Sequence, residues 1–125
     1  KKKGCVSTYI SGNGLEENIK KRLNKSISAE SFLKQSIYNK EEKKILNEFY
    51  KLYGLSLANI INTIDPDVIV LGGGLSNHDE LYEKGLKKVY KNVFCDEPDT
   101  PIFKNTLGDS AGVIGAAIIG KMNYL

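Results

Sequence analysis

The sequence has 125 residues and a net charge of +3, with 41% hydrophobic and 26% charged side chains. These proportions are those of an ordinary folded domain, so they exclude an intrinsically disordered chain. The sequence contains no apolar run of about 18 residues, so it also excludes a membrane-spanning helix, and we expect no membrane partner.

The first residues and the cysteines bear on cellular location. Residues 1–4 are not followed by an apolar segment, so we expect no secretory signal. Cys5 and Cys95 are too few and too far apart to form a disulfide framework or a Cys-x-x-Cys pair. The expected location is therefore a reducing cytoplasm.

The positive charge is concentrated in the first half of the chain. Residues 1–54 carry a net charge of +6 and residues 55–125 a net charge of −3. A basic segment of this kind can attract nucleic acid or phosphate. Its lysines alternate with glutamates, however, and Arg22 is the single arginine. This pattern favours solvated helix faces, and we expect no nucleic-acid partner.

Residues 1–65 predict a helical region. After a break at residues 12–14, the apolar spacing predicts a helix over 15–23. Ser28 is a candidate N-cap for a short helix that follows. A long helix is predicted over 40–64, because its apolar positions recur every three or four residues and form one buried stripe. Gly54 interrupts this stripe and permits a bend.

Residues 66–125 predict a β-α-β-α order. Pro66 ends the long helix, and the β-branched run 68–71 predicts a strand that is buried on both faces. A helix is expected to run to about Val93, with Ser76, Asn77 and Asp79 as candidate caps. A second strand is predicted over 101–105 and a last helix over 111–122.

Two strands cannot form a stable α/β sheet alone, and the apolar first strand needs neighbours on both edges. We therefore expect the chain to be part of a larger fold, or to pair with another chain.

The strongest candidate site is the turn formed by Gly72, Gly73 and Gly74 after the first predicted strand. Glycines at such a strand end let a ligand approach the backbone closely, and the N-terminus of a following helix favours phosphate. The spacing matches neither GxGxxG nor GxxxxGK[ST]. A tight turn that requires a positive φ explains the same glycines, and the residues alone do not decide between the two.

A second candidate is the segment that begins at Gly108, with Asp109 as an N-cap for the last helix. Gly112, Gly115 and Ala116 give that helix a face almost without side chains. Such a face either packs closely on another element or accommodates a flat ligand. His78 is the only histidine, so no histidine-based metal cluster can form within this chain.

Three segments together resemble the C-terminal half of ROK-family sugar kinases, and in particular bacterial fructokinases and N-acetylglucosamine kinases. They are GCVSTYISGNGL from Gly4, NTIDPDVIVLGGGLSN from Asn62 and GDSAGVIGAA from Gly108. The resemblance covers essentially the whole chain.

The resemblance implies an α/β, actin-like (RNase H-like) ATPase fold that transfers phosphate from ATP–Mg²⁺ to a sugar hydroxyl. It implies nucleotide binding by Gly72, Gly73 and Gly74 and by Gly108, Asp109 and Gly112. Of the family's zinc site, only Cys5 has a counterpart here. The helical first half resembles the family's dimer-forming region, so a homodimer is expected.

Several family features are absent from this sequence. These are the first phosphate loop, the catalytic aspartate and the remaining zinc ligands, and Ser7 stands where the family has a sugar-binding glutamate. The chain alone is therefore expected to be inactive. Two alternatives stay open: the effector-binding portion of a ROK-type transcriptional repressor, and a truncated remnant without catalysis. The sequence upstream of this segment distinguishes them.

Overall fold

The computed structural model describes residues 4–123 and begins with short helices. Helix α1 spans Ser7–Ile10, α2 spans Gly12–Leu23 and α3 spans Ala29–Leu33. The predicted break at residues 12–14 is wrong, because all three residues belong to α2: the Ser11 side chain accepts a hydrogen bond from the Gly14 amide and caps the helix. Ser28 caps α3 as predicted, by accepting from the Ser31 amide.

Helix α4 spans Lys40–Ile64 and has the predicted bounds. Its first turn is closed by a capping box, in which Asn39 Oδ1 accepts from the Glu42 amide and the Glu42 carboxylate accepts from the Asn39 amide. The helix ends at Asp65, which adopts the left-handed conformation with φ of 50° ahead of Pro66. Local capping chemistry therefore fixes both ends of the longest element.

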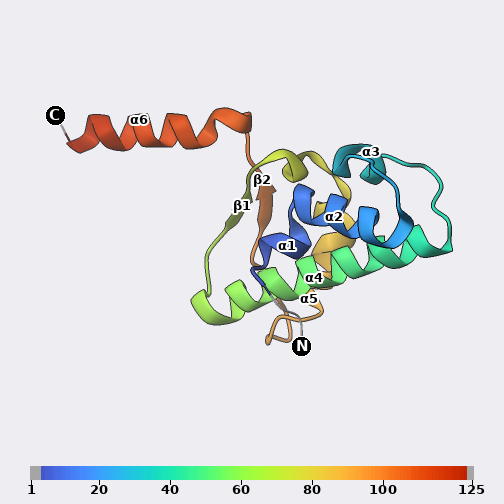
Figure 1. The fold of residues 1–125 in the computed structure, drawn as a ribbon. Helices are drawn as coiled ribbons and strands as arrows, with labels where there is room; N and C mark the ends of the chain where they lie inside the picture. Colours follow the sequence, from blue (N-terminus) through green and yellow to red (C-terminus); the bar gives the residue numbers. More distant parts are fainter. Residues whose placement is uncertain (1–3, 124–125) are drawn as a thin grey trace.

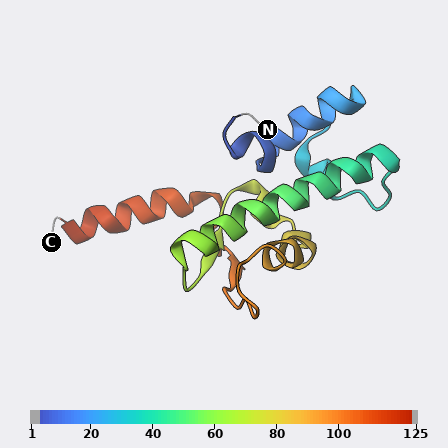
Figure 2. The same cartoon turned by 90° about the horizontal axis from the view of Figure 1, so that it is seen from below.

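The hydrophobic core lies along α4, which crosses the whole body in Figure 2. Helices α1 and α2 contact it on one side, and the segment from Leu81 to Tyr90 packs against it on the other. Phe49 is 2% exposed, and Ile45 and Ile19 are completely buried. The helical first half and the mixed second half therefore share one core.

Strands β1 (Ile69–Leu71) and β2 (Ile102–Lys104) form a parallel two-stranded sheet with Ile69 opposite Ile102. The strands lie where the sequence predicts them. The expectation that β1 is buried on both faces is not met within residues 4–123, because Val70 is 59% exposed. The apolar strand thus has an open face and an open edge in this part of the chain.

The helix predicted to run to Val93 is shorter and irregular. A 3₁₀ turn, η1 (Gly74–Asn77), follows β1, and a π-helical turn, η2 (Leu81–Gly85), leads into α5 (Leu86–Tyr90). No side chain caps η2, so the predicted caps Ser76, Asn77 and Asp79 are wrong. Leu81 and Val89 form the buried side of this segment.

Helix α6 spans Ala111–Asn123, follows the short turn η3 (Gly108–Ser110) and projects away from the body (Figure 1, red). Its apolar side chains Val113, Ile118, Ile119 and Met122 are all more than half exposed. A Cβ atom added at Gly112 or Gly115 would meet no atom within 4 Å. Close packing of the small-residue face therefore does not occur within the described residues.

Among residues 4–123, no helix combines the length and the apolar character that crossing a bilayer would require.

Candidate functional site

The two glycine segments lie at the same edge of the sheet. The first glycine turn (Gly72, Gly73 and Gly74) follows the carboxyl end of β1, and the second glycine turn (residues 108–112) follows β2 after three residues. Since β1 and β2 are paired and parallel, their carboxyl ends coincide, with Leu71 opposite Lys104. This edge is where open α/β sheets bind ligands.

Asn105 joins the two strand ends. Its backbone amide donates to the Leu71 carbonyl at 3.0 Å, and its side-chain Nδ2 donates to the same carbonyl at 3.1 Å. Nδ2 also lies 3.2 Å from Ser76 Oγ, which in turn donates to the Gly73 carbonyl at 2.7 Å. These bonds fix the first glycine turn relative to β2. Asn105 Oδ1 is buried and has no hydrogen-bond partner among the described residues.

The glycines of both turns face open space. Gly73 has a φ of +80° and Gly108 a φ of +63°, which disfavours any residue with a side chain. A Cβ atom at Gly72, Gly74 or Gly112 would meet nothing within 4 Å. A positive φ therefore explains Gly73 and Gly108, whereas neither packing nor a positive φ explains the other three in this part of the chain.

The expected phosphate-binding helix terminus is not present after the first glycine turn. The turn runs into the four-residue 3₁₀ helix η1 rather than a long helix, so no large helix dipole points at it. Any anion held at this turn would instead be bound by backbone amides of the glycines themselves.

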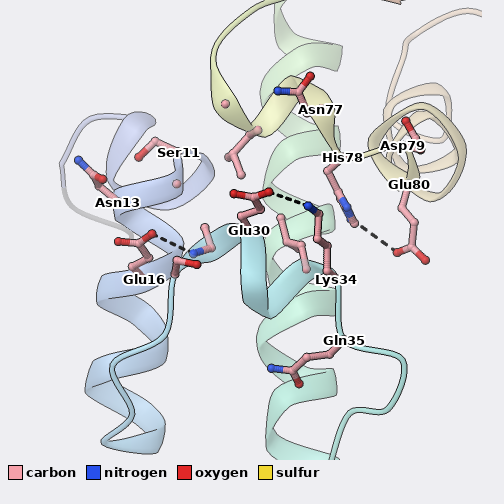
Figure 3. A pocket seen from close by; sticks show the side chains of 16 residues that line it. Ser11, Asn13, Glu16, Glu30, Lys34, Gln35, Asn77, His78, Asp79 and Glu80 are labelled. Carbon is pink, nitrogen blue, oxygen red and sulfur yellow. Dashed lines mark hydrogen bonds and ion pairs between the residues drawn. The ribbon is translucent and has the colours of Figure 1, made fainter. Parts of the chain in front are cut away.

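A pocket of about 920 Å³ opens beside the first glycine turn, and this volume falls within the range of about 300 to 1,000 Å³ that is common for small-molecule sites. Its walls come from the start of α2, from α3 and from the segment between Gly74 and Glu80 (Figure 3). We call it the acidic pocket, because four carboxylates and a single lysine line it: Glu16, Glu30, Asp79, Glu80 and Lys34.

The carboxylates of the acidic pocket are held in place by different partners. Glu16 Oε1 accepts from the Ala29 amide at 2.8 Å and so binds the first turn of α3. Glu30 pairs with Lys34 at 2.6 Å, and this pairing lowers the pKa of Glu30. The pocket therefore presents mostly hydrogen-bond acceptors and negative charge.

A buried tyrosine supports the wall on the side of α4. Tyr50 is 3% exposed, and its hydroxyl donates to Glu80 Oε2 at 2.8 Å. The same hydroxyl lies 2.7 Å from His78 Nε2. Burial raises the pKa of Tyr50, so the phenol keeps its proton. Burial also lowers the pKa of His78, which favours the neutral imidazole.

The structure brings some of the predicted site residues together and leaves others apart. Gly72, Gly73, Gly74 and Gly108 lie at the sheet edge, and Gly112 is the second residue of the projecting α6. The side chain of Asp109 lies outside the described residues. Cys5 is exposed, and no group of three histidine, cysteine, aspartate or glutamate side chains able to hold a metal occurs in residues 4–123. One thiol does not fit a tetrahedral zinc site, so we assign none.

Sequence reasoning missed the residues that hold the site together. The sequence places Asn105 only at the end of a predicted strand, and it gives no sign of a role for Tyr50. Their partners lie about 30 residues away in sequence, and no local pattern reveals such contacts.

Sequence comparison gives matches along almost the whole chain. The ROK family profile matches residues 1–123. The N-acetyl-D-glucosamine kinase of Histophilus somni is 40% identical over 120 residues, and that of Pasteurella multocida is 38% identical over 120 residues. Each alignment covers 94% of this chain and 39% of the relative. The chain thus spans about two fifths of the length of the curated relatives that it matches.

Solved structures show the same fold. A ROK hexokinase from Thermus thermophilus superposes with a TM-score of 0.78 at 23% identity, covering 94% of this chain and 40% of that one. A ROK family glucokinase from Streptomyces griseus, solved with glucose and AMPPNP, gives a TM-score of 0.74 at 23% identity over 94% of this chain and 45% of its own. These likenesses confirm the expected fold class, a helix-rich part of an actin-like ATPase fold.

Proposed function

Because the chain belongs to the ROK family, we propose that it forms the C-terminal, nucleotide-binding part of an ATP-dependent sugar kinase. The observation that carries this proposal is the arrangement at the sheet edge. Two open glycine turns lie at the carboxyl ends of paired parallel strands. Asn105 joins the two strand ends, and the acidic pocket opens beside the first turn.

The charges of the site indicate where the base, the ribose and the phosphates of a nucleotide would bind. A triphosphate would be repelled by the carboxylates of the acidic pocket, whereas an uncharged base and ribose would not. We therefore place the base and ribose in the acidic pocket and the phosphates at the glycine turns, whose glycines are exposed. Mg²⁺ would accompany the phosphates, and we assign it no side chain of this chain.

The sugar would be phosphorylated only in a complete protein. The curated relatives named above are N-acetyl-D-glucosamine kinases, which supports an N-acetylated hexosamine or a related hexose as the substrate, with fructose as the alternative. Ser7 is short and uncharged, so it would contribute less to sugar binding than a glutamate. We expect no phosphoryl transfer by these 125 residues alone, because positioning and charge stabilisation need several parts at once.

The exposed apolar surfaces support the view that more protein covers this chain. Val70 on β1 and the apolar side chains of α6 lie open to solvent, which would be costly in an isolated protein. We propose that the remainder of the kinase fold covers them, and that the helical first half forms a homodimer. A cytoplasmic location belongs to the same proposal, since both cysteines are free and exposed.

Calorimetric titration of the purified chain with AMPPNP–Mg²⁺ tests nucleotide binding. We expect saturable binding that is lost in Gly73→Val, because a β-branched residue cannot adopt a φ of +80° without strain. Gly120→Val is the matched control, since Gly120 has no neighbour within 4 Å and no positive φ. Absence of binding by the unsubstituted chain, or equal binding by both variants, would contradict the proposal.

A further inference from the structure

The hydrogen bonds around Tyr50 determine which nitrogen of His78 carries a proton. The single phenolic proton of Tyr50 is directed at Glu80 Oε2, 2.8 Å away. Glu80 is ionised at neutral pH because its pKa is lowered, first by its hydrogen bond with Lys84, so its carboxylate can only accept. The Tyr50 oxygen is then left with lone pairs toward His78 Nε2 at 2.7 Å.

His78 Nε2 must therefore carry a hydrogen and donate it to Tyr50. If Tyr50 instead donated its proton to His78 Nε2, the Tyr50 oxygen and the Glu80 carboxylate would lie 2.8 Å apart without a proton between them, which is repulsive. In the neutral imidazole, a proton on Nε2 leaves Nδ1 as an acceptor. Nδ1 has no hydrogen-bond partner among residues 4–123.

His78 is a wall residue of the acidic pocket, where it lies between Lys34 and Glu80 (Figure 3). Its side chain is 14% exposed and its ring stacks at 19° to that of Tyr50, so the imidazole is oriented before any ligand binds. An oriented acceptor in a largely buried wall discriminates well between ligands that do and do not offer it a donor.

We propose that His78 Nδ1 accepts a hydrogen bond from the exocyclic amino group of an adenine base in the acidic pocket. This inference rests on the proposed function, and it adds the residue that selects adenine over a purine with a 6-oxo group. The other lining groups agree with it, because Glu16, Glu30 and Asp79 are also acceptors and suit the hydroxyl donors of a ribose. A 6-oxo group would place a second acceptor against Nδ1.

Two substitutions separate ligand recognition from the contact with Tyr50. An asparagine places its amide near the position of Nδ1, so His78→Asn keeps an acceptor at that position and loses the bond to Tyr50. A glutamine reaches the position of Nε2, so His78→Gln keeps a donor to Tyr50 and loses the acceptor. The measurement is calorimetric titration of the chain and both variants with ATP–Mg²⁺ and with ITP–Mg²⁺.

We expect the unsubstituted chain and His78→Asn to bind ATP about tenfold more tightly than ITP, and His78→Gln to bind the two within about twofold. Equal binding of ATP and ITP by the unsubstituted chain overturns this inference and leaves the proposed function intact. Loss of selectivity in His78→Asn with retention in His78→Gln also overturns it, because the contact with Tyr50 would then matter instead. Absence of binding of either nucleotide overturns both proposals.

Discussion

Gly54 of α4 lies directly against the backbone of Lys88 in α5. A Cβ atom at Gly54 would lie 2.6 Å from the Lys88 carbonyl carbon and oxygen, which no real contact permits. The sequence permits a bend at this glycine, but the structure gives a different reason for the glycine, namely the close approach of two helix backbones. This contact holds α5, and with it the segment that forms one wall of the acidic pocket, against the core.

Replacing Gly54 by alanine should destabilise the fold by about 2 to 3 kcal/mol, because a methyl group would have to displace backbone rather than a flexible side chain. The free energy of unfolding from urea titrations measures this. Gly115→Ala is the control, since its added methyl group meets nothing within 4 Å and alanine favours a helix. Equal stability of the two variants would show that α5 does not approach α4 as described.

Removing the cap of α4 should destabilise the chain less than the Gly54→Ala substitution does. In Asn39→Ala, the amides of Glu41 and Glu42 lose the acceptor Asn39 Oδ1, to which both lie at 3.0 Å. We expect a loss of about 1 kcal/mol in the free energy of unfolding, and recovery of most of it in Asn39→Ser, because serine is also a good N-cap. If Asn39→Ser were no more stable than Asn39→Ala, the cap would not explain where this helix begins.

Stability should fall as the pH falls below about 6.5, the ordinary pKa of histidine. Burial lowers the pKa of His78 in the folded chain below its value in the unfolded chain. Between these two pKa values the unfolded chain binds more protons, so the free energy of unfolding decreases as the pH falls through this range. The groups that face His78 are Tyr50 from α4, Lys34 at the end of α3 (Figure 3) and, from its own segment, Asp79, Glu80 and Lys84. The negative charges of Glu80 and Asp79 favour the protonated imidazole of His78, but burial has the larger effect on its pKa.

Urea titrations between pH 7.5 and 5.5 measure this effect before the glutamates, whose ordinary pKa is 4.5, begin to titrate. The same titrations on His78→Asn give the control, in which stability should be nearly constant over the range. A chain that became more stable toward pH 5.5 would mean that His78 is paired as a cation.

Asn105→Ala should weaken nucleotide binding about tenfold while changing global stability by less than about 1.5 kcal/mol. The substitution removes the side-chain bonds to Leu71 and Ser76, so the first glycine turn loses its side-chain connection to β2, whereas the backbone bond from residue 105 to Leu71 remains. Lys104→Ala is a neighbouring control with an exposed side chain. Titration with AMPPNP–Mg²⁺ together with a thermal melt checks both parts, and unchanged affinity in Asn105→Ala would remove Asn105 from the site.

Local chemistry made some of this structure predictable. The bounds of α4 follow from the Asn39 cap, the apolar stripe and Pro66, and all of these are visible within a few residues. The irregular segment before α5 could not be predicted in the same way. Its π turn brings Gly85 against the ring of Tyr53, where a Cβ atom would lie 2.7 Å from Cε1, and that contact joins residues more than 30 positions apart.

The same distinction applies to the site. Glycines 72–74 and Gly108 are conspicuous in the sequence, and the resemblance to a known family gave them a meaning. The acidic pocket is not visible there, because its walls combine the helical first half with the segment after β1. Nor does the sequence show that Asn105 and Ser76 meet, since their contact depends on the parallel pairing of β1 with β2.

The most direct test of nucleotide binding at this sheet edge is amide chemical-shift mapping of the isotope-labelled chain during titration with AMPPNP–Mg²⁺. We expect saturable shifts at the amides of Gly72, Gly73 and Gly108, accompanied by shifts at His78. Shifts confined to the lysine-rich surface of α2 and α4, or no saturable shifts at all, would contradict the account.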